Sequence, residues 1–265
     1  MWAHASVASR HSSRVLANYR MNQARLPGGL SSEPRPCSLY GVTGRKQARM
    51  VEADPTPRSP LDVLVAEVRM RLRTSGRPFL VAVDGRSGAG KSTIAGQAAA
   101  ILDAALVPTD DFFAATLTDR AWSERSPPRR VADALDWRRL RAEALEPLLA
   151  GRPAHWRAFD FEAGARPDGS YAFRTLLTEC RPRPVVILEG AYSSRPELTD
   201  LIALAVLIET PAPLRRARLA AREAPEHLAV WHARWDAAED YYFTKVRTRN
   251  AFPLVLEGVT SPASS

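Results

Sequence analysis

The chain of 265 residues has few cysteines and no long apolar run. Its two cysteines, Cys37 and Cys180, lie far apart and lack the spacing of metal ligands. A disulfide framework and a cysteine zinc site are therefore excluded, and a reducing, cytoplasmic location is favoured. No apolar run approaches 18 residues, so the sequence predicts no membrane span and no membrane partner. The hydrophobic content of 45% is enough for a substantial core.

Acidic residues are almost missing from the first 50 positions. That segment holds eight Arg or Lys residues and one acid, Glu33, which accounts for +7 of the chain's net charge of +8. The remaining residues are close to neutral. We therefore expect no nucleic-acid partner for the folded part of the chain.

Residues 1–58 also lack sustained apolar periodicity and are rich in Ser, Arg, Pro and Gly. This composition predicts a disordered basic extension. Three origins stay open: an over-extended start with translation beginning at Met21 or Met50, an organelle transit peptide, or a functional basic tail. We expect one folded domain over residues 59–258 and a flexible tail over 259–265.

Lysine is scarce, with three among 37 basic residues, and one of the three lies in the strongest motif of the chain. The apolar run Phe79–Asp84 predicts a buried strand, and Ile94–Leu102 predicts a helix. Between them, the phosphate loop Gly85-Arg86-Ser87-Gly88-Ala89-Gly90-Lys91-Ser92-Thr93 fits the pattern G-x-x-x-x-G-K-[ST]. Glycines allow backbone N–H groups to point at phosphate oxygens, Lys91 can reach the β- and γ-phosphates, and Ser92 can bind Mg²⁺. The motif predicts a nucleotide-phosphate site.

Short apolar segments alternate with helical patterns along the rest of the chain. This order is typical of an α/β fold with a doubly wound parallel sheet flanked by helices. Residues 108–128 are expected to form a loop, and residues 155–177 a small insertion that covers the substrate. The expected strands are 79–84, 104–107, 185–188, 204–208 and 254–256, and the expected helices are 61–73, 94–102, 137–149, 211–223 and 226–243.

Carboxylates follow three of the expected strands, at the sheet edge where ligands bind in such folds. Glu189 comes after four aliphatic residues and is a candidate for holding Mg²⁺ together with Ser92. Asp110 and Asp111 follow the second strand, where a carboxylate can take the proton of an acceptor hydroxyl. In an extended segment only one of the two should face the phosphate. Asp84 is expected to orient the phosphate loop.

Three arginines, Arg215, Arg218 and Arg222, share one face of an expected helix. Such a stripe can close over transferring phosphates as a lid, and a solvated face is the alternative interpretation. Trp231, Trp235 and Tyr242 keep helical spacing, which is more typical of core packing than of a stacking surface.

Seven segments together resemble the uridine kinase-like P-loop kinases, a group with uridine–cytidine, nicotinamide riboside, pantothenate and phosphoribulo kinases. The order of the phosphate loop, an Asp-Asp-Phe-Phe segment and a Glu-Gly pair is more specific than the loop alone. The matching segments are residues 83–93, 109–113, 132–137, 159–161, 188–190, 210–222 and 239–243.

The resemblance implies a P-loop NTPase fold with a helical lid. It implies catalytic roles for Asp110, Lys91, Arg215 and Arg218, and a nucleotide contact for Arg222. The acceptor would be contacted by Asp111, Phe113, Phe159, Asp160 and Tyr192. Arg130-Val131-Ala132, Phe159 and Gly164 depart from uridine–cytidine kinases at positions that recognise the sugar and base, so a pyrimidine nucleoside is not implied.

We therefore expect a kinase that uses ATP and Mg²⁺ to phosphorylate a hydroxyl of a small molecule, in the first place a nucleoside. GTP is the alternative donor. Pantothenate, nicotinamide riboside or a sugar are alternative acceptors, and a homo-oligomer is compatible with the sequence. A nucleotide-dependent switch ATPase is the alternative from another class, although the guanine-reading Asn-Lys-x-Asp is absent.

Overall fold

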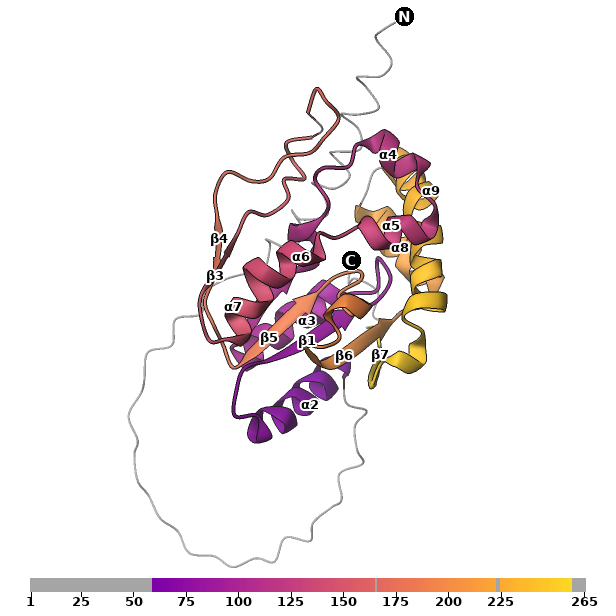
Figure 1. Ribbon diagram of the computed structural model, residues 1–265. Helices are drawn as coiled ribbons and strands as arrows, with labels where there is room; N and C mark the ends of the chain where they lie inside the picture. Colours follow the sequence, from indigo (N-terminus) through magenta and orange to yellow (C-terminus); the bar gives the residue numbers. More distant parts are fainter. Residues whose placement is uncertain (1–58, 165, 223–224, 259–265) are drawn as a thin grey trace, which may run out of the picture.

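The computed structural model describes residues 59–258 except 165 and 223–224, without the side chains of 222, 225–228, 230 and 231. The predicted extension 1–58 and tail 259–265 lie outside the described residues. The expected parallel α/β sheet is confirmed, with five strands in the order β2-β5-β1-β6-β7 (Figure 1). These strands are β1 (Phe79–Asp84), β2 (Ala105–Pro108), β5 (Val185–Glu189), β6 (Ile202–Glu209) and β7 (Leu254–Glu257).

The sheet has a core on both faces because its strands are apolar without interruption. All six residues of β1 are buried. Successive strand side chains point to opposite faces, so Val81 and Val83 join the cluster with α2 (Pro60–Thr74) and α3 (Lys91–Leu102). Leu80 belongs to the cluster on the other face, which includes the helical segment from Trp137 to Leu149. Each such aliphatic side chain contributes about 1.5–3 kcal/mol when buried.

Helix starts follow the capping chemistry of the sequence. Ser59 and Asp62 form a reciprocal capping box at the start of α2. The single helix expected over 137–149 is α6 (Trp137–Leu140), the π segment η2 (Arg141–Leu145) and α7 (Glu146–Leu149). The widened segment precedes Pro147, which lacks the N–H needed for a regular helical bond.

The prediction of a loop over residues 108–128 is wrong. The structure has the 3-10 helix η1 (Thr109–Phe112), α4 (Asp119–Glu124) and α5 (Pro127–Asp133) there. Proline at the start of α5 is tolerated because the first helical N–H needs no partner. Thr118 caps α4, and Trp122 is fully buried, so packing stabilises a helix too short to persist alone.

Residues 154–180 contain an antiparallel pair, β3 (Ala154–Trp156) and β4 (Thr178–Cys180), that is separate from the main sheet. A short 3-10 turn, η3 (Pro196–Leu198), follows β5. The pair lies on the side of α6 and α7 in Figure 1.

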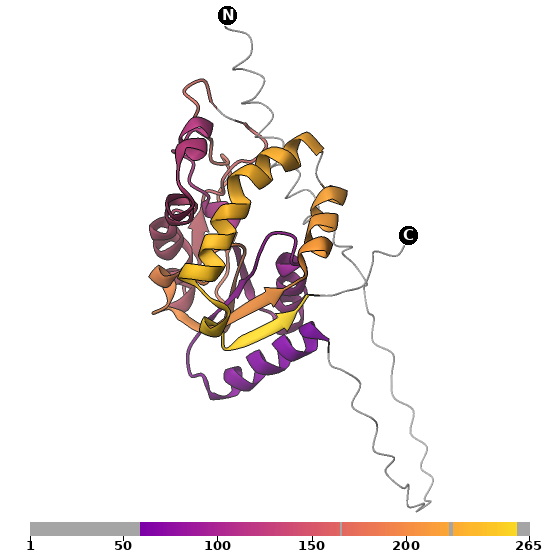
Figure 2. The ribbon, with the colours of Figure 1, turned by 90° about the vertical axis from the view of Figure 1, so that its right-hand side faces the viewer.

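Beyond the carboxyl end of β6 the chain forms two helices, α8 (Ala212–Arg222) and α9 (Pro225–Tyr241), which rise past the sheet in Figure 2. The chain then returns through the π segment η4 (Tyr242–Val246) and the turn η5 (Arg249–Ala251) to β7. No helix within the described residues is long and apolar enough to cross a membrane.

Candidate active site

The phosphate loop connects β1 to α3 by a path that only glycine permits at two positions. Gly85 has φ +148°, and a Cβ there would meet the Ile208 carbonyl oxygen at 2.5 Å. Gly88 has φ +76°, and its Cβ would meet the carbonyl oxygen of Arg215 at 2.7 Å. A positive φ and this close approach both require glycine. The start of α8 therefore lies directly against the loop.

Asp84 anchors this loop rather than facing a ligand. Its side chain is fully buried. One carboxylate oxygen accepts from the N–H groups of Gly85 (2.8 Å) and Tyr192 (3.1 Å), and the other from the Ser194 N–H (2.9 Å) and the Tyr242 hydroxyl (2.8 Å). Burial raises the pKa of this carboxyl above its ordinary value, while three of these bonds and Lys91 act to lower it.

Lys91 and the two predicted Mg²⁺ ligands lie at the carboxyl edge of the sheet. Lys91 is buried, and its Nζ donates to the Arg86 carbonyl at 3.0 Å across the loop. The Ser92 hydroxyl donates to Glu189 Oε2 at 3.0 Å, so the hydroxyl and the carboxylate predicted to share a metal are in contact. Within the described residues there is no group of three His, Cys, Asp or Glu that could hold a metal ion.

The lid arginines bond to the loop's carbonyl groups. Arg215 Nη1 donates to Ser87 O and Arg218 Nη1 to Gly88 O, both at 3.2 Å. Burial lowers the pKa of Arg215. These contacts place two guanidinium groups beside the loop, as the lid interpretation requires. Arg222 lies in α8, but its side chain is outside the described residues.

Asp110 and Asp111 lie in the 3-10 turn η1, so the expectation of an extended segment is wrong, and their side chains have different surroundings. Asp110 lines a pocket next to the phosphate loop. Asp111 is buried and does not line that pocket; its Oδ2 accepts from Trp156 Nε1 at 2.8 Å. The Phe159 N–H also donates to the Asp111 carbonyl.

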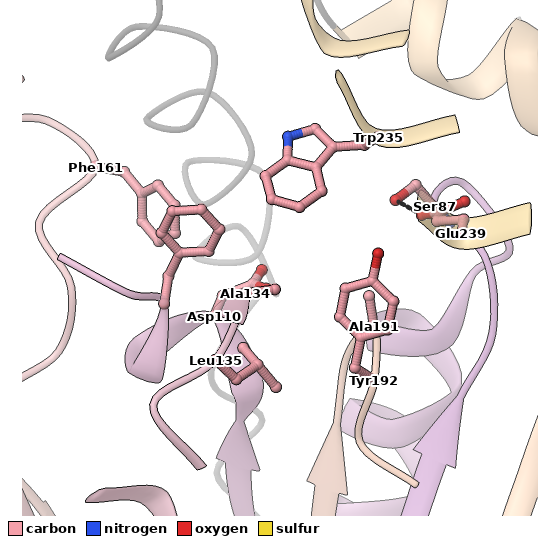
Figure 3. Close-up of a pocket in the computed structure, with 10 residues that line it drawn as sticks. Ser87, Asp110, Ala134, Leu135, Phe161, Ala191, Tyr192, Trp235 and Glu239 are labelled. Carbon is pink, nitrogen blue, oxygen red and sulfur yellow. Dashed lines mark hydrogen bonds between the residues drawn. The ribbon is translucent and has the colours of Figure 1, made fainter. Parts of the chain in front are cut away.

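The pocket beside Asp110 has a cavity volume of about 80 Å³ and reaches the phosphate loop at Ser87 (Figure 3). Small and aliphatic side chains form part of its wall, and the remaining lining residues are aromatic or acidic. The aromatic and acidic ones are Phe113, Phe161, Tyr192, Trp235, Asp110 and Glu239.

The remaining predicted substrate residues take different positions. Phe113 and Tyr192 line the pocket. Phe159 is buried against Phe113, with the two ring centroids 5.2 Å apart. Asp160 caps a turn by accepting from the N–H groups of Glu162 and Ala163. Phe159 and Asp160 thus support the wall without lining it.

Among the aromatic and acidic residues of the pocket, three were not predicted as site residues: Phe161, Trp235 and Glu239. Trp235 has the helical spacing expected of core packing, and it does pack on Trp122 with ring centroids 5.2 Å apart. It also lines the pocket. Glu239 Oε1 accepts from both Ser87 N–H (3.0 Å) and Ser87 Oγ (2.6 Å), a contact across 152 residues that no local pattern indicates.

A second pocket borders the loop at Arg86 and has a cavity volume of about 530 Å³. Arg86 and Arg215 line it, together with Phe243 and residues at the ends of β6 and β7. Arg86 also pairs with Asp240 of α9. Consecutive loop residues, Arg86 and Ser87, therefore border two different pockets.

No family model matches the chain. It is 29% identical over 157 residues to a uridine kinase from Lactobacillus johnsonii, a match that covers 57% of this chain and 71% of the relative. A possible uridine kinase from Bacillus stearothermophilus superposes with a TM-score of 0.53 at 18% identity, over 74% of this chain and 97% of that one. The chain resembles the uridine kinase-like P-loop kinases and shares their fold.

A D-glycerate 3-kinase from Cryptococcus neoformans var. grubii has the same fold, with a TM-score of 0.52 at 14% identity over 74% of this chain and 93% of that chain. Two proteins that share this fold are thus named for different acceptors, uridine and D-glycerate. The resemblance and the fold that the sequence predicts are confirmed. The fold is compatible with more than one acceptor.

Proposed function

We propose that this chain is a small-molecule kinase that transfers the γ-phosphate of ATP to a hydroxyl, in the first place that of a nucleoside. The observation that carries the proposal is the shared pocket of Asp110 and Ser87. The Asp110 carboxylate and a residue of the phosphate loop border one cavity. An acceptor in this cavity would lie beside both its general base and the γ-phosphate of ATP. We assign the kinase domain to residues 59–258 and the enzyme to the cytoplasm.

The two pockets suggest how donor and acceptor are arranged. The larger pocket would hold the base and ribose of the donor beside Arg86 and Phe243, whose guanidinium and ring already contact each other at 5.3 Å. The phosphates of the donor nucleotide would cross the loop. The N–H groups of the loop and Lys91 would neutralise the negative charge of these phosphates. The γ-phosphate would then reach the pocket of Asp110 from the side of Ser87. GTP as donor is tested by repeating the acceptor panel below with GTP in place of ATP.

Asp110 would act as general base. Its carboxylate would accept the proton of the acceptor hydroxyl as that oxygen attacks the γ-phosphorus, while the bond to the leaving ADP oxygen breaks. Arg215 and Arg218 already bond to loop carbonyls. Small rotations of their side chains would let them stabilise charge on the transferring group.

Ser92 and Glu189 fit a Mg²⁺ site. A hydroxyl and a carboxylate in contact at 3.0 Å offer oxygen ligands, which Mg²⁺ prefers. Mg²⁺ commonly keeps several waters and uses only one or two carboxylates with substrate phosphates, so two protein ligands are sufficient. When bound, the ion would neutralise phosphate charge.

The direct test is ATP consumption with and without a panel of nucleosides, pantothenate, glycerate and sugars. A kinase turns ATP over only with its acceptor. Lys91→Ala should abolish transfer and weaken ATP binding, because a phosphate contact is lost. Lys245→Ala is the matched control, since this lysine is exposed on η4. ATP hydrolysis without any acceptor would favour the switch ATPase, and unchanged turnover by Lys91→Ala would refute the nucleotide site.

A further inference from the structure

The peptide group that joins Arg86 to Ser87 is held from both sides. Its carbonyl oxygen accepts from Lys91 Nζ at 3.0 Å, and its N–H donates to Glu239 Oε1 at 3.0 Å. Because a trans peptide group is planar, its carbonyl and its N–H point in opposite directions. One rigid group therefore connects the lysine of the phosphate loop to a carboxylate in the last turn of α9.

Glu239 fixes the N–H side of this peptide group. The residue is only 3% exposed, and its Oε1 also accepts from the Ser87 hydroxyl at 2.6 Å (Figure 3). Hydrogen bonds to a charged acceptor are roughly twice as strong as bonds between neutral groups. Turning the peptide group over would take a donor away from a buried carboxylate, which is costly. The contact therefore favours the orientation in which the Arg86 carbonyl faces Lys91.

Lys91 depends on that orientation. Its ammonium is buried and donates to the Arg86 carbonyl. An ammonium has three donors, so Nζ can keep this bond and still donate to the phosphates of a nucleotide. If the peptide group turned over, its N–H would face Nζ in place of the oxygen, and two donors cannot bond to each other. Lys91 would then lose the partner that holds it at the loop.

We infer that Glu239 is a positioning residue for Lys91. It acts through the peptide group between Arg86 and Ser87 and sets the place from which the ammonium meets phosphate, without a contact to the nucleotide itself. The inference rests on the proposed function, because it concerns the affinity of the proposed ATP site. It gives the end of α9 a role in nucleotide binding, although 152 residues separate Ser87 from Glu239.

Two conservative variants separate the reach of the Glu239 side chain from its charge. Glu239→Gln keeps the length and an oxygen that can accept from Ser87, but it removes the charge. Glu239→Asp keeps the charge and is one CH₂ group shorter, so its carboxylate no longer reaches Ser87. Glu179→Asp is the matched control, because Glu179 is an exposed residue of β4 outside both pockets.

The measurement is the Kd of ATP by calorimetry on the full chain, with Tm recorded for each variant. Glu239→Asp should bind ATP about tenfold more weakly than the wild type, because two hydrogen bonds to a charged group are lost. Glu239→Gln and the control should stay within a few-fold of the wild type. Normal ATP binding by Glu239→Asp, tighter binding by it, or an equal loss in Glu239→Gln would each overturn the inference.

The same substitution in a Lys91→Ala background tests the route through the lysine. If Glu239 acts through Lys91, Glu239→Asp should leave the ATP affinity of the Lys91→Ala protein almost unchanged, so the two effects are not additive. A purely structural role would give the same fold loss in both backgrounds and would overturn the inference.

Failure of the proposed function is recognised separately. No ATP binding by the wild type, or equal ATP binding by Lys91→Ala and the wild type, would remove the nucleotide site, and this inference would fall with it. If ATP binds and the variants behave as expected but no acceptor is phosphorylated, the inference is supported and the kinase proposal alone fails.

Discussion

Asp84→Asn should destabilise the fold, although the substitution keeps the shape of the side chain. The carboxylate accepts four hydrogen bonds, two at each oxygen, from Gly85, Tyr192, Ser194 and Tyr242. Asparagine can keep one oxygen in place for two of these donors. Its NH₂ group then points at the other two donors, so the N–H of Ser194 loses its acceptor inside the core.

The expected cost follows from those losses. A hydrogen bond to a charged group contributes about 1.5–3 kcal/mol, and a buried donor left unpaired costs about 1–3 kcal/mol. Removing a buried charge offsets part of this, because burial raises the pKa of Asp84 and thus disfavours its ionised form. We expect a net loss of about 2–4 kcal/mol in the free energy of unfolding, or about 4–16 °C in Tm for a domain of this size.

The assay is thermal and urea unfolding of the wild type, Asp84→Asn and a control. Asp200→Asn is the matched control, because Asp200 pairs with Arg141 at the surface with its side chain 57% exposed. Such an exposed pair contributes about 0–1 kcal/mol. A Tm for Asp84→Asn no lower than that of the control would refute the role of Asp84 as the anchor of the loop.

Three further predictions concern the lid, the buried aspartate and the N-terminal extension. Changing Arg215 or Arg218 to Ala should lower kcat by about a hundredfold and raise KM less, as measured by steady-state kinetics; near-wild-type values for both would favour a solvated face. Trp156→Phe should cost about 1–3 kcal/mol in urea unfolding because the buried Asp111 carboxylate loses a donor at 2.8 Å, and an unchanged midpoint would contradict that bond's importance. Deleting residues 1–55 should leave Tm and activity almost unchanged, since the segment has little apolar surface to bury; a large fall in Tm would show that it packs on the domain.

The sheet could be predicted because its signals are local. The run Phe79–Asp84 is apolar throughout, and the glycine-rich loop after it has a fixed pattern, so strand and loop are both encoded within a few residues. The side chains of Ser59 and Asp136 accept hydrogen bonds at the starts of α2 and α6, and Ser and Asp are residue types that favour this position. The loop expected over 108–128 failed because α4 and α5 depend on burying Trp122 and Val131 against distant residues, which a local pattern cannot show.

The site also contains residues that could be predicted from local sequence signals and residues that could not. Ser92 and Glu189 could be paired in advance because both follow parallel strands at one sheet edge. Trp235 and Glu239 could not, because α9 reaches the phosphate loop only through the tertiary fold. The matching segment 239–243 indicated from the sequence that the end of this helix resembles the uridine kinase-like kinases. It gave no information on which of its side chains contacts Ser87.

The measurement that tests the central proposal most directly is kcat for Asp110→Asn beside Asp111→Asn, with ATP affinity from calorimetry. Asparagine at 110 keeps the shape and removes the base, so ATP should still bind while transfer falls by about 10²–10⁴-fold. Asp111→Asn should lower the stability of the fold and should reduce kcat much less than Asp110→Asn does. The reason is that the Asp111 carboxylate accepts a hydrogen bond from Trp156 and does not line the pocket. Near-normal transfer by Asp110→Asn with loss of transfer by Asp111→Asn would contradict the assignment of the base, and near-normal transfer by both would contradict the hydroxyl kinase itself.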